Sequence, residues 1–382
     1  MISPTSELYF ENPRSLVRGN SVRLLRDGAE VFPAWLSAID AARVRISLEM
    51  YIFSDDQIGR RVAEALCRAA ERGVEVRVLY DDIGCRLTPR AFFSEMRARG
   101  VKTIAYHRSR GWRPKIWKLF RRNHRKALTI DRTQTFVGGL NISNEWVPAK
   151  EGGEDWRDAV VEIRGPSARD VEAAFAVVWN RRARVQSRLV LEAEGVSSAS
   201  GGASIAVITN AERGERFAIR RSCLHAIRAA NERVLLATPY FVPDRGIQRA
   251  LESAAARGCR VCILVPSDSD SQILDAAARA TFPRLLAAGV KIWRSPAVIH
   301  TKAIAVDRSF VSLGSYNLDH RSLAFNLEIV ANVMDAKFNE DVAAMLESEI
   351  VAATEVSLAM LMARPALWRL ADRIAHSFRQ WL

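Results

Sequence analysis

Apolar and polar positions along the chain follow two periods in turn, and this alternation predicts strands and helices that follow one another. Continuous apolar runs at 44–53 (VRISLEMYIF) and 233–242 (RVLLATPYFV) are typical of buried strands. Further along, residues 65–79 read ALCRAAERGVEVRVL and residues 250–264 read ALESAAARGCRVCIL. Both follow the pattern A-L-x-x-A-A-x-R-G-x-x-V-x-x-L, a helix that ends at glycine and leads into a buried strand. The alternation predicts an α/β fold with a largely parallel or mixed sheet.

The repeated pattern also predicts that the chain consists of two related halves. In each half a second helix ends in Gly-Val-Lys, beginning at Gly100 and at Gly289. Between the halves lies EGVSSASGGAS (194–204), a stretch with few side chains to bury, as is typical of a linker. The expected divisions are a first half at 18–194, a linker at 195–204, a second half at 205–355 and a C-terminal segment at 356–382.

Composition restricts the class of protein. The chain has 382 residues, of which 49% are hydrophobic and 26% charged, and this excludes disordered and fibrous classes. No apolar run reaches the roughly 18 residues that a membrane-spanning helix needs, and no secretory signal is expected at the start. An odd number of cysteines, 5, favours a reducing compartment. Because Cys259-x-x-Cys262 has no second pair, we expect buried thiols there rather than a zinc site.

The charge balance indicates an anionic partner. Lys and Arg number 56 and Asp and Glu number 43, so the formal net charge is +13. Nucleic acid and an anionic lipid surface are the two main candidates, and a solvated basic surface is the third interpretation.

The halves share one segment that carries candidate chemistry. Residues 124–144 read HRKALTIDRTQTFVGGLNISN and residues 300–320 read HTKAIAVDRSFVSLGSYNLDH, with 7 of 21 positions identical. The identical pairs are His124/His300, Lys126/Lys302, Ala127/Ala303, Asp131/Asp307, Arg132/Arg308, Gly138/Gly314 and Asn141/Asn317. His and Lys two positions apart would project from the same face of a strand, whereas the following alanine would point into the core.

This repeated pattern, H-x-K-x4-D-x6-G-[GS]-x-N, resembles the signature of the phospholipase D superfamily. The presence of one copy in each half is similar to its single-chain members, in which two pseudo-symmetric α/β halves, each a mixed sheet flanked by helices, share one active site at their interface. GNSVRLLRDGAEVFPAWLSAI near the start and TPYFVPDRGIQRAL later resemble the bacterial cardiolipin synthases of the shorter kind. Those enzymes join two phospholipids and release glycerol or a similar alcohol.

The resemblance implies a set of catalytic residues and their roles. The residues of the signature are His124, Lys126, Asp131, His300, Lys302 and Asp307. A neutral imidazole would attack phosphorus and form a phosphohistidine, and the other histidine would protonate the leaving alcohol. On the family's usual pattern His124 is the nucleophile and His300 the acid and base. The two lysines would offset the phosphoryl charge, so no metal or cofactor is expected.

Other residues are expected to support these groups. Substrate contacts are expected from Asn141, Asn317, Gly139 and Ser315. A carboxylate should orient each histidine: Asp158 follows the first motif copy, and Glu328 follows the second. We expect Asp131 and Asp307, although they belong to the signature, to stabilise the motif turn rather than to touch substrate.

Two basic and apolar segments are candidates for membrane contact. The stretch from Gly100 to His124 in the first half is longer than the matching stretch from Gly289 to His300 in the second. The additional residues fall in 106–126, rich in Arg, Lys and Trp, which predicts docking on an anionic leaflet, a groove for single-stranded nucleic acid, or a plain exposed loop.

The C-terminal segment 356–382 can form an apolar helical stripe, with Pro365 beginning or kinking a helix. This stripe could contact the membrane or the protein's own core. The resemblance to the shorter bacterial cardiolipin synthases implies a peripheral enzyme on the cytoplasmic face of a bacterial membrane, with phosphatidylglycerol as donor and acceptor. The alternative is a phospholipase D-type phosphodiesterase or nuclease that uses water as acceptor.

Overall fold

The computed structural model describes residues 6–107, 121–191, 201–211, 214–269 and 271–379. Its strands form one mixed sheet in the order β15-β11-β10-β9-β12-β13-β14-β8-β1-β7-β6-β5-β2-β3-β4. The first-half strands are β1 Val17–Arg26, β2 Arg45–Met50, β3 Glu75–Asp81, β4 Lys102–Tyr106, β5 Ala127–Ile130, β6 Gln134–Gly138 and β7 Ala159–Arg164. The second-half strands are β8 Ala203–Thr209, β9 Arg233–Ala237, β10 Arg260–Pro266, β11 Lys291–Ser295, β12 Ala303–Val306, β13 Phe310–Gly314, β14 Ile329–Met334 and β15 Thr354–Glu355.

The strand order is symmetric about the pair β1 and β8. Counted outward from this pair, β7, β6, β5, β2, β3 and β4 correspond to β14, β13, β12, β9, β10 and β11. In both halves the outer strands are parallel (β2, β3 and β4; β9, β10 and β11), and the inner strands are antiparallel. The expected pair of α/β halves with mixed sheets is confirmed. The pairing of β1 with β8 joins them edge to edge, which the repeat did not predict.

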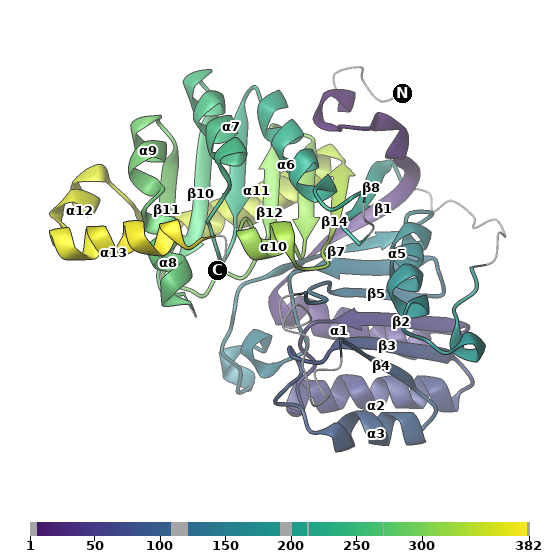
Figure 1. Cartoon of the computed structure of the whole chain (residues 1–382). Coiled ribbons are helices and arrows are strands. Elements are labelled where there is room, and N and C mark those ends of the chain that lie inside the picture. Colours follow the sequence, from purple (N-terminus) through teal and green to yellow (C-terminus); the bar gives the residue numbers. More distant parts are fainter. Residues whose placement is uncertain (1–5, 108–120, 192–200, 212–213, 270, 380–382) are drawn as a thin grey trace.

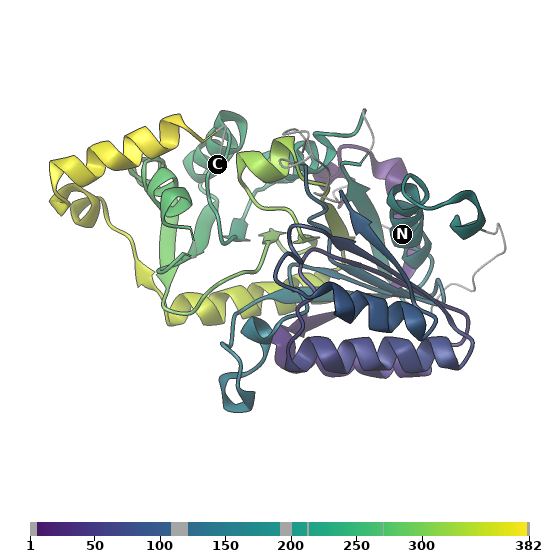
Figure 2. The same ribbon diagram turned by 60° about the horizontal axis from the view of Figure 1, so that its bottom comes forward.

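Helices cover both faces of the sheet (Figures 1 and 2). The helices are α1 Asp27–Ala41, α2 Gln57–Glu71, α3 Arg90–Ala98, α5 Ala168–Asn180, α6 Ala218–Ala229, α7 Arg245–Ala256, α8 Gln272–Arg279, α9 Phe282–Ala287, α10 His320–Ala324, α11 Ala336–Val351, α12 Leu358–Ala363 and α13 Ala366–Ser377. Successive residues of β3 point to opposite faces: Val78 joins the core under α1, α2 and α3, whereas Leu79 packs with α5.

The repeated helix-to-strand pattern forms α2 with β3 and α7 with β10, as expected. Asp56 caps α2 by accepting the backbone N–H of Gly59, and Asp244 caps α7 in the same way at Gly246. After each helix a glycine adopts a left-handed backbone, with φ of +89° at Gly73 and +92° at Gly258. Only glycine takes this conformation without strain, and it lets the chain turn directly into the strand.

One hydrophobic cluster joins the halves. Val137 and Val161 from the first half pack in the same core as Val311 and Ala331 from the second half. The N-terminal residues also cross over, because the Tyr9 hydroxyl donates a hydrogen bond of 2.6 Å to the Asp307 carboxylate. A shared core and shared hydrogen bonds fix the relative position of the halves, which a site at their interface requires.

Several expectations are met or modified at this level. Residues 192–200 of the expected linker lie outside the described residues, and β8 begins at Ala203, before the expected start of the second half. The five cysteines are free and buried, as expected for the Cys259-x-x-Cys262 pair. Pro365 precedes α13, so the C-terminal segment forms two helices. Among the described residues we find no helix with the length and apolar character to cross a membrane.

Candidate active site

Both motif copies meet where the halves adjoin. His124 and Lys126 lie directly before β5, and His300 and Lys302 directly before β12, rather than within the strands as expected. Ala127 and Ala303, the first strand residues, are buried in the core as expected. The segment before each short strand carries its histidine and lysine, and contacts between the halves bring these segments together.

Backbone hydrogen bonds between the halves hold the two histidines in place. The His124 N–H donates to the Leu327 carbonyl at 2.9 Å, and the His300 N–H donates to the Arg157 carbonyl at 2.7 Å. Each motif segment is therefore fixed by the residue that precedes the carboxylate of the other half. His124 and His300 are 9% and 8% exposed, so both rings reach solvent only slightly.

The carboxylates pair with the histidines across the halves. Nδ1 of His124 lies 3.0 Å from Oε1 of Glu328, and Nδ1 of His300 lies 2.6 Å from Oδ2 of Asp158. Asp158 and Glu328 each contact a histidine, as expected for orienting acids, but the histidine belongs to the other half, a choice that the sequence left open. The physical reason is the cross-half backbone pairing, which brings the segment before β14 to His124 and the segment before β7 to His300.

Burial dominates the electrostatics of His124. Loss of water lowers the pKa of His124 to about 4, although Glu328 opposes the shift, and Lys126 adds to it. Burial acts to raise the pKa of Glu328, but His124, Lys126 and Ser315 together outweigh that effect, and the pKa is lowered. Because an ionised carboxylate only accepts hydrogen bonds, Nδ1 of His124 carries the proton. Its Nε2 then keeps a lone pair at neutral pH.

His300 sits in a more cationic environment. Burial, followed by the charges of Lys302, Lys126 and His124, lowers its pKa well below the ordinary value. Burial raises the pKa of Asp158 to about 6, against the attraction of Lys302. Since the charge of Lys126 from the first motif copy acts on His300 of the second, the two copies belong to one electrostatic site.

The lysines lie beside the histidines. Nζ of Lys126 donates to the His124 carbonyl at 2.7 Å and lies 5.1 Å from the centre of the Tyr51 ring. Nζ of Lys302 donates to the His300 carbonyl and lies 2.7 Å from Nδ1 of His300. Burial lowers the pKa of Lys126 well below its usual range. A bound anion would relieve that cost, since it stabilises the charged ammonium.

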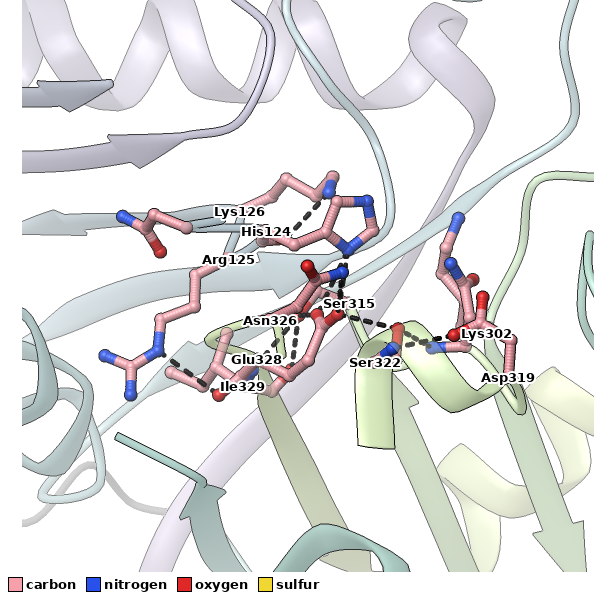
Figure 3. Close-up of polar contacts among 12 residues, drawn as sticks. His124, Arg125, Lys126, Lys302, Ser315, Asp319, Ser322, Asn326, Glu328 and Ile329 are labelled. Atoms are coloured by element: carbon pink, nitrogen blue, oxygen red, sulfur yellow. Dashed lines mark hydrogen bonds and ion pairs between the residues drawn. The ribbon is translucent and has the colours of Figure 1, made fainter. Parts of the chain in front are cut away.

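Glu328 is held by a dense set of donors (Figure 3). Besides His124, it accepts hydrogen bonds from the Ser315 hydroxyl at 2.5 Å and from the Ser322 hydroxyl at 2.8 Å. The Asn326 amide adds a contact at 3.3 Å. Ser315 was expected to contact substrate, but its hydroxyl is fully buried and bonded to Glu328. Ser315 therefore holds the carboxylate in this structure, and its contact with substrate stays a prediction.

Gly139 has the corresponding place in the first half. A Cβ atom at Gly139 would lie 2.4 Å from Oδ1 of Asp158, so only glycine leaves room for that carboxylate. Gly139 was expected to contact substrate, and its observed neighbour is again a histidine-orienting acid. The two positions after the motif glycine thus accommodate the carboxylates.

The remaining motif residues divide into two groups. Asn141 and Asn317 are buried beside the site; Oδ1 of Asn141 accepts the Ile52 N–H at 3.1 Å, and the Asn317 N–H donates to Ser322 at 3.3 Å. Their contact with substrate stays a prediction. Asp131 and Asp307 lie at the far ends of β5 and β12 from the histidines.

Asp131 and Asp307 act on the backbone, as the turn interpretation predicted. Asp131 accepts the N–H groups of 43–45, and Asp307 accepts those of 231–233. Each carboxylate therefore ties the end of a motif strand to the start of its neighbour. Both residues belong to the catalytic signature, but these hydrogen bonds go to the backbone and not to the histidines.

Sequence reasoning missed a buried charged layer and an aromatic wall. Arg125 belongs to the basic segment 106–126 that was expected to dock on the membrane, and that expectation is wrong for this residue: it is fully buried, and its guanidinium donates to the carbonyls of Glu328 and Ala174. The rings of Trp146 and Trp156 lie 5.1 and 5.8 Å from the His300 ring. The sequence did contain a signal for Arg125. It is a charged residue between His and Lys, and the second half has no charged residue at that position.

Comparisons with known proteins agree with this geometry. The family model described as "Cardiolipin synthase, PLD-like domain" matches residues 35–179 and 223–350. Cardiolipin synthase A of Pseudomonas entomophila (strain L48) is 34% identical over 357 residues, covering 93% of this chain and 74% of that protein. Cardiolipin synthase A of Pseudomonas aeruginosa (strain LESB58) is 35% identical over 337 residues, covering 88% and 68%.

Among solved structures, phosphatidylserine synthase of Haemophilus influenzae Rd KW20 has a similar fold. The TM-score is 0.69 at 14% identity, covering 94% of this chain and 95% of that one. The similarity of fold, the two motif copies and the matched family model give one conclusion: the chain belongs to the cardiolipin synthase family of phospholipase D-like proteins.

Proposed function

We propose that the chain is a cardiolipin synthase that transfers a phosphatidyl group from one phosphatidylglycerol to the hydroxyl of another. The observation that carries the proposal is the pair of buried histidines, each held at Nδ1 by a carboxylate of the other half. This arrangement supplies one ring that can attack phosphorus and one that can exchange a proton. Family membership supports the choice of phospholipid as substrate.

The first step forms a covalent intermediate. Nε2 of His124 attacks the donor phosphorus, and the bond from phosphorus to the glycerol oxygen breaks. His300 gives its proton to that oxygen, and glycerol leaves. The low pKa of His124 favours its neutral, attacking form. The anionic phosphodiester, placed between Lys126 and Lys302, offsets the cations that depress the pKa of His300 and so favours its protonated form.

The second step reverses these roles. His300, now neutral, takes the proton from the hydroxyl of the second phosphatidylglycerol, and the hydroxyl oxygen attacks phosphorus. The bond between phosphorus and Nε2 of His124 breaks, which releases cardiolipin and restores both rings. Asp158 stabilises the imidazolium of His300 in each step, as a carboxylate does beside a general base.

The test is product analysis on phosphatidylglycerol vesicles by mass spectrometry. We expect cardiolipin and glycerol in equal amounts. Phosphatidic acid with glycerol and no cardiolipin would instead establish a hydrolase with water as acceptor. Peptide mapping of the acid-quenched, labelled enzyme should place the phosphoryl group on His124, and label on His300 would reverse the two roles.

The C-terminal helices support a peripheral position on an anionic bilayer. Helix α13 is attached to α8 through polar groups: buried Asp372 forms ion pairs with Arg279 and Arg364. Its outward face is apolar instead. The exposed large apolar side chains of α12, α13 and the following residue are Leu358, Met360, Met362, Leu367, Trp368, Leu370, Ile374 and Phe378.

An exposed apolar face of this kind marks a site of contact with a membrane or with another protein. Arg369, Arg373 and Arg379 lie among the exposed apolar residues, and cations of this kind favour anionic lipid headgroups. We therefore assign this face to the bilayer that holds the substrate. The basic segment proposed for the same role lies largely outside the described residues, at 108–120.

A further inference from the structure

A basic pocket lies beside the active site, at the seam between the two halves. The end of β4, the end of α5, the end of β8 and the segment after α10 form its walls. Its lining includes four arginines: Arg121, Arg181, Arg182 and Arg216. The cavity measures about 250 Å³, below the roughly 300 Å³ at which pockets for whole small molecules begin, and this size suits a headgroup.

Among the described residues, no carboxylate is paired with the arginines of this pocket. Arg181 donates to the Ala211 carbonyl at 3.1 Å, and Arg182 lies 4.9 Å from the centre of the Tyr106 ring. Burial, followed by the charge of Arg121, lowers the pKa of Arg216. Cations crowded in this way favour a bound anion.

The pocket shares its wall with the catalytic centre. Leu327 lines the pocket, and its carbonyl accepts the His124 N–H at 2.9 Å. Asn326 lines it too, and contacts the Glu328 carboxylate that orients His124. Asn210 completes this wall: its amide donates to the Asn326 carbonyl, and its oxygen accepts the Glu328 N–H. An anion in the pocket would therefore lie one layer of residues from the nucleophile.

We propose that this pocket binds the phosphodiester of the second, acceptor phospholipid. The proposal rests on the proposed function, because only a reaction between two phospholipids brings two phosphodiesters to one site. The histidines and lysines neutralise the phosphodiester under attack. The second anion needs its own countercharge, and arginine forks match its paired oxygens.

The test compares an anionic with a neutral acceptor in one reaction. Phosphatidylglycerol vesicles with added ethanol allow two products, cardiolipin and phosphatidylethanol, from the same phosphoryl-enzyme. In the variant Arg182→Gln/Arg216→Gln we expect the ratio of cardiolipin to phosphatidylethanol to fall at least tenfold. Total donor consumption should stay within about twofold, since the histidine and lysine centre is unchanged. A ratio equal to that of the wild type would overturn the proposal.

Matched controls separate this role from general charge effects. Arg61→Gln/Arg249→Gln removes the same charge from two exposed helical arginines that form no ion pair in the described part of the chain. This control should keep the wild-type product ratio. An equal fall in the control and the pocket variant would assign the effect to net charge and contradict the pocket.

A direct binding measurement tests the pocket independently of the proposed function. If the wild type forms no cardiolipin, that function fails, and calorimetric titration with glycerophosphoglycerol, the deacylated headgroup, still tests the pocket. We expect the pocket variant to bind this probe at least tenfold more weakly than the wild type. Equal binding by both proteins would overturn the proposal, and so would tighter binding of inorganic phosphate, which would identify a free-phosphate site.

Discussion

At the scale of single residues, the two carboxylates of the site differ in how the protein treats their charge. Glu328 is surrounded by donors, and its pKa is lowered, so its carboxylate is ionised at neutral pH. Asp158 accepts from the Ala159 N–H and from Trp146, yet burial still raises its pKa to about 6. Asp158 is therefore held ionised at a cost in stability, as is common for groups with a catalytic task.

The cost of keeping Asp158 ionised predicts that Asp158→Asn increases the free energy of unfolding by an amount that depends on pH. The pKa is about 6 in the folded protein, against an ordinary value of 3.8, so the folded state binds the proton more tightly than the unfolded state. Below about pH 4 the carboxyl is protonated in both states and has no such effect. As the pH rises from about 4 to about 6 the free energy of unfolding falls, by roughly 3 kcal/mol in all. Urea unfolding should show that the free energy of unfolding of the variant rises relative to that of the wild type between these pH values. A stability difference that does not change with pH would contradict this account.

A second residue-scale prediction concerns the donors to Glu328. Ser322→Ala removes a hydrogen bond to this carboxylate, and such bonds to charged groups contribute about 1.5–3 kcal/mol. We expect kcat to fall about tenfold with KM little changed, because the side chain acts through Glu328 rather than on substrate.

The pH profile distinguishes positioning from simple damage to the fold. Loss of a donor raises the pKa of Glu328, so the acid limb of kcat/KM should move to higher pH in Ser322→Ala. Ser222→Ala is the control, since Ser222 is equally buried and bonded to Asn332, away from Glu328. If both variants lose the same activity with no shift of the limb, the effect is structural.

At the scale of elements, α13 is amphipathic in the opposite sense to a helix such as α2. α2 buries Ile58, Val62 and Leu66 and exposes arginines, as a helix on a soluble core does. α13 buries Asp372 and leaves Trp368 60% exposed. The apolar stripe was visible in the sequence, but its direction was not, because direction depends on the Arg279 partner that α8 supplies.

Membrane binding should depend on this face of α13. Trp368→Ser/Phe378→Ser removes two large apolar groups, each contributing about 1.5–3 kcal/mol if fully buried in the bilayer. Because insertion is partial, we expect sedimentation with phosphatidylglycerol vesicles to weaken at least tenfold. Turnover of a soluble short-chain phosphodiester should not change.

The control for this prediction uses apolar residues elsewhere that are even more exposed than Trp368 and Phe378. Leu87→Ser/Val351→Ser alters side chains that are 85% and 87% exposed, and it should leave vesicle binding intact. Wild-type protein that sediments as a dimer in solution, together with a monomeric Trp368→Ser/Phe378→Ser variant, would assign the face to a second copy of the chain instead.

At the scale of the whole molecule, the sequence predicted the parts better than their connections. The repeat predicted two α/β halves and the positions of His124 and His300, because helix and strand periods are local properties. It did not predict the pairing of β1 with β8, nor which acid meets which histidine. Those acid–histidine contacts join residues far apart in the sequence and depend on how the halves dock, which no local period encodes.

Each acid contacts the histidine of the other half, and this predicts how variants of the two acids differ. If each acid contacted the histidine of its own half, the expected difference would be reversed. Glu328 orients the proposed nucleophile His124, and Asp158 orients the proposed acid His300. With a p-nitrophenyl phosphodiester, whose leaving group needs no proton, Asp158→Asn should release p-nitrophenol in the first turnover at close to the wild-type rate. Glu328→Gln should slow the same burst at least tenfold, since the attacking ring is no longer held.

With an alkyl phosphodiester of poor leaving group, both variants should be slow, because acid catalysis contributes about 10²–10⁴-fold in such a step. Stopped-flow measurement of the burst with each substrate gives four rates for comparison with the wild type. A burst that fails in Asp158→Asn but survives in Glu328→Gln would mean that His300 is the nucleophile or that each acid serves its own half. Mapping the trapped phosphoryl group to His124 or His300 decides between those two, so the contacts across the seam are open to a direct chemical test.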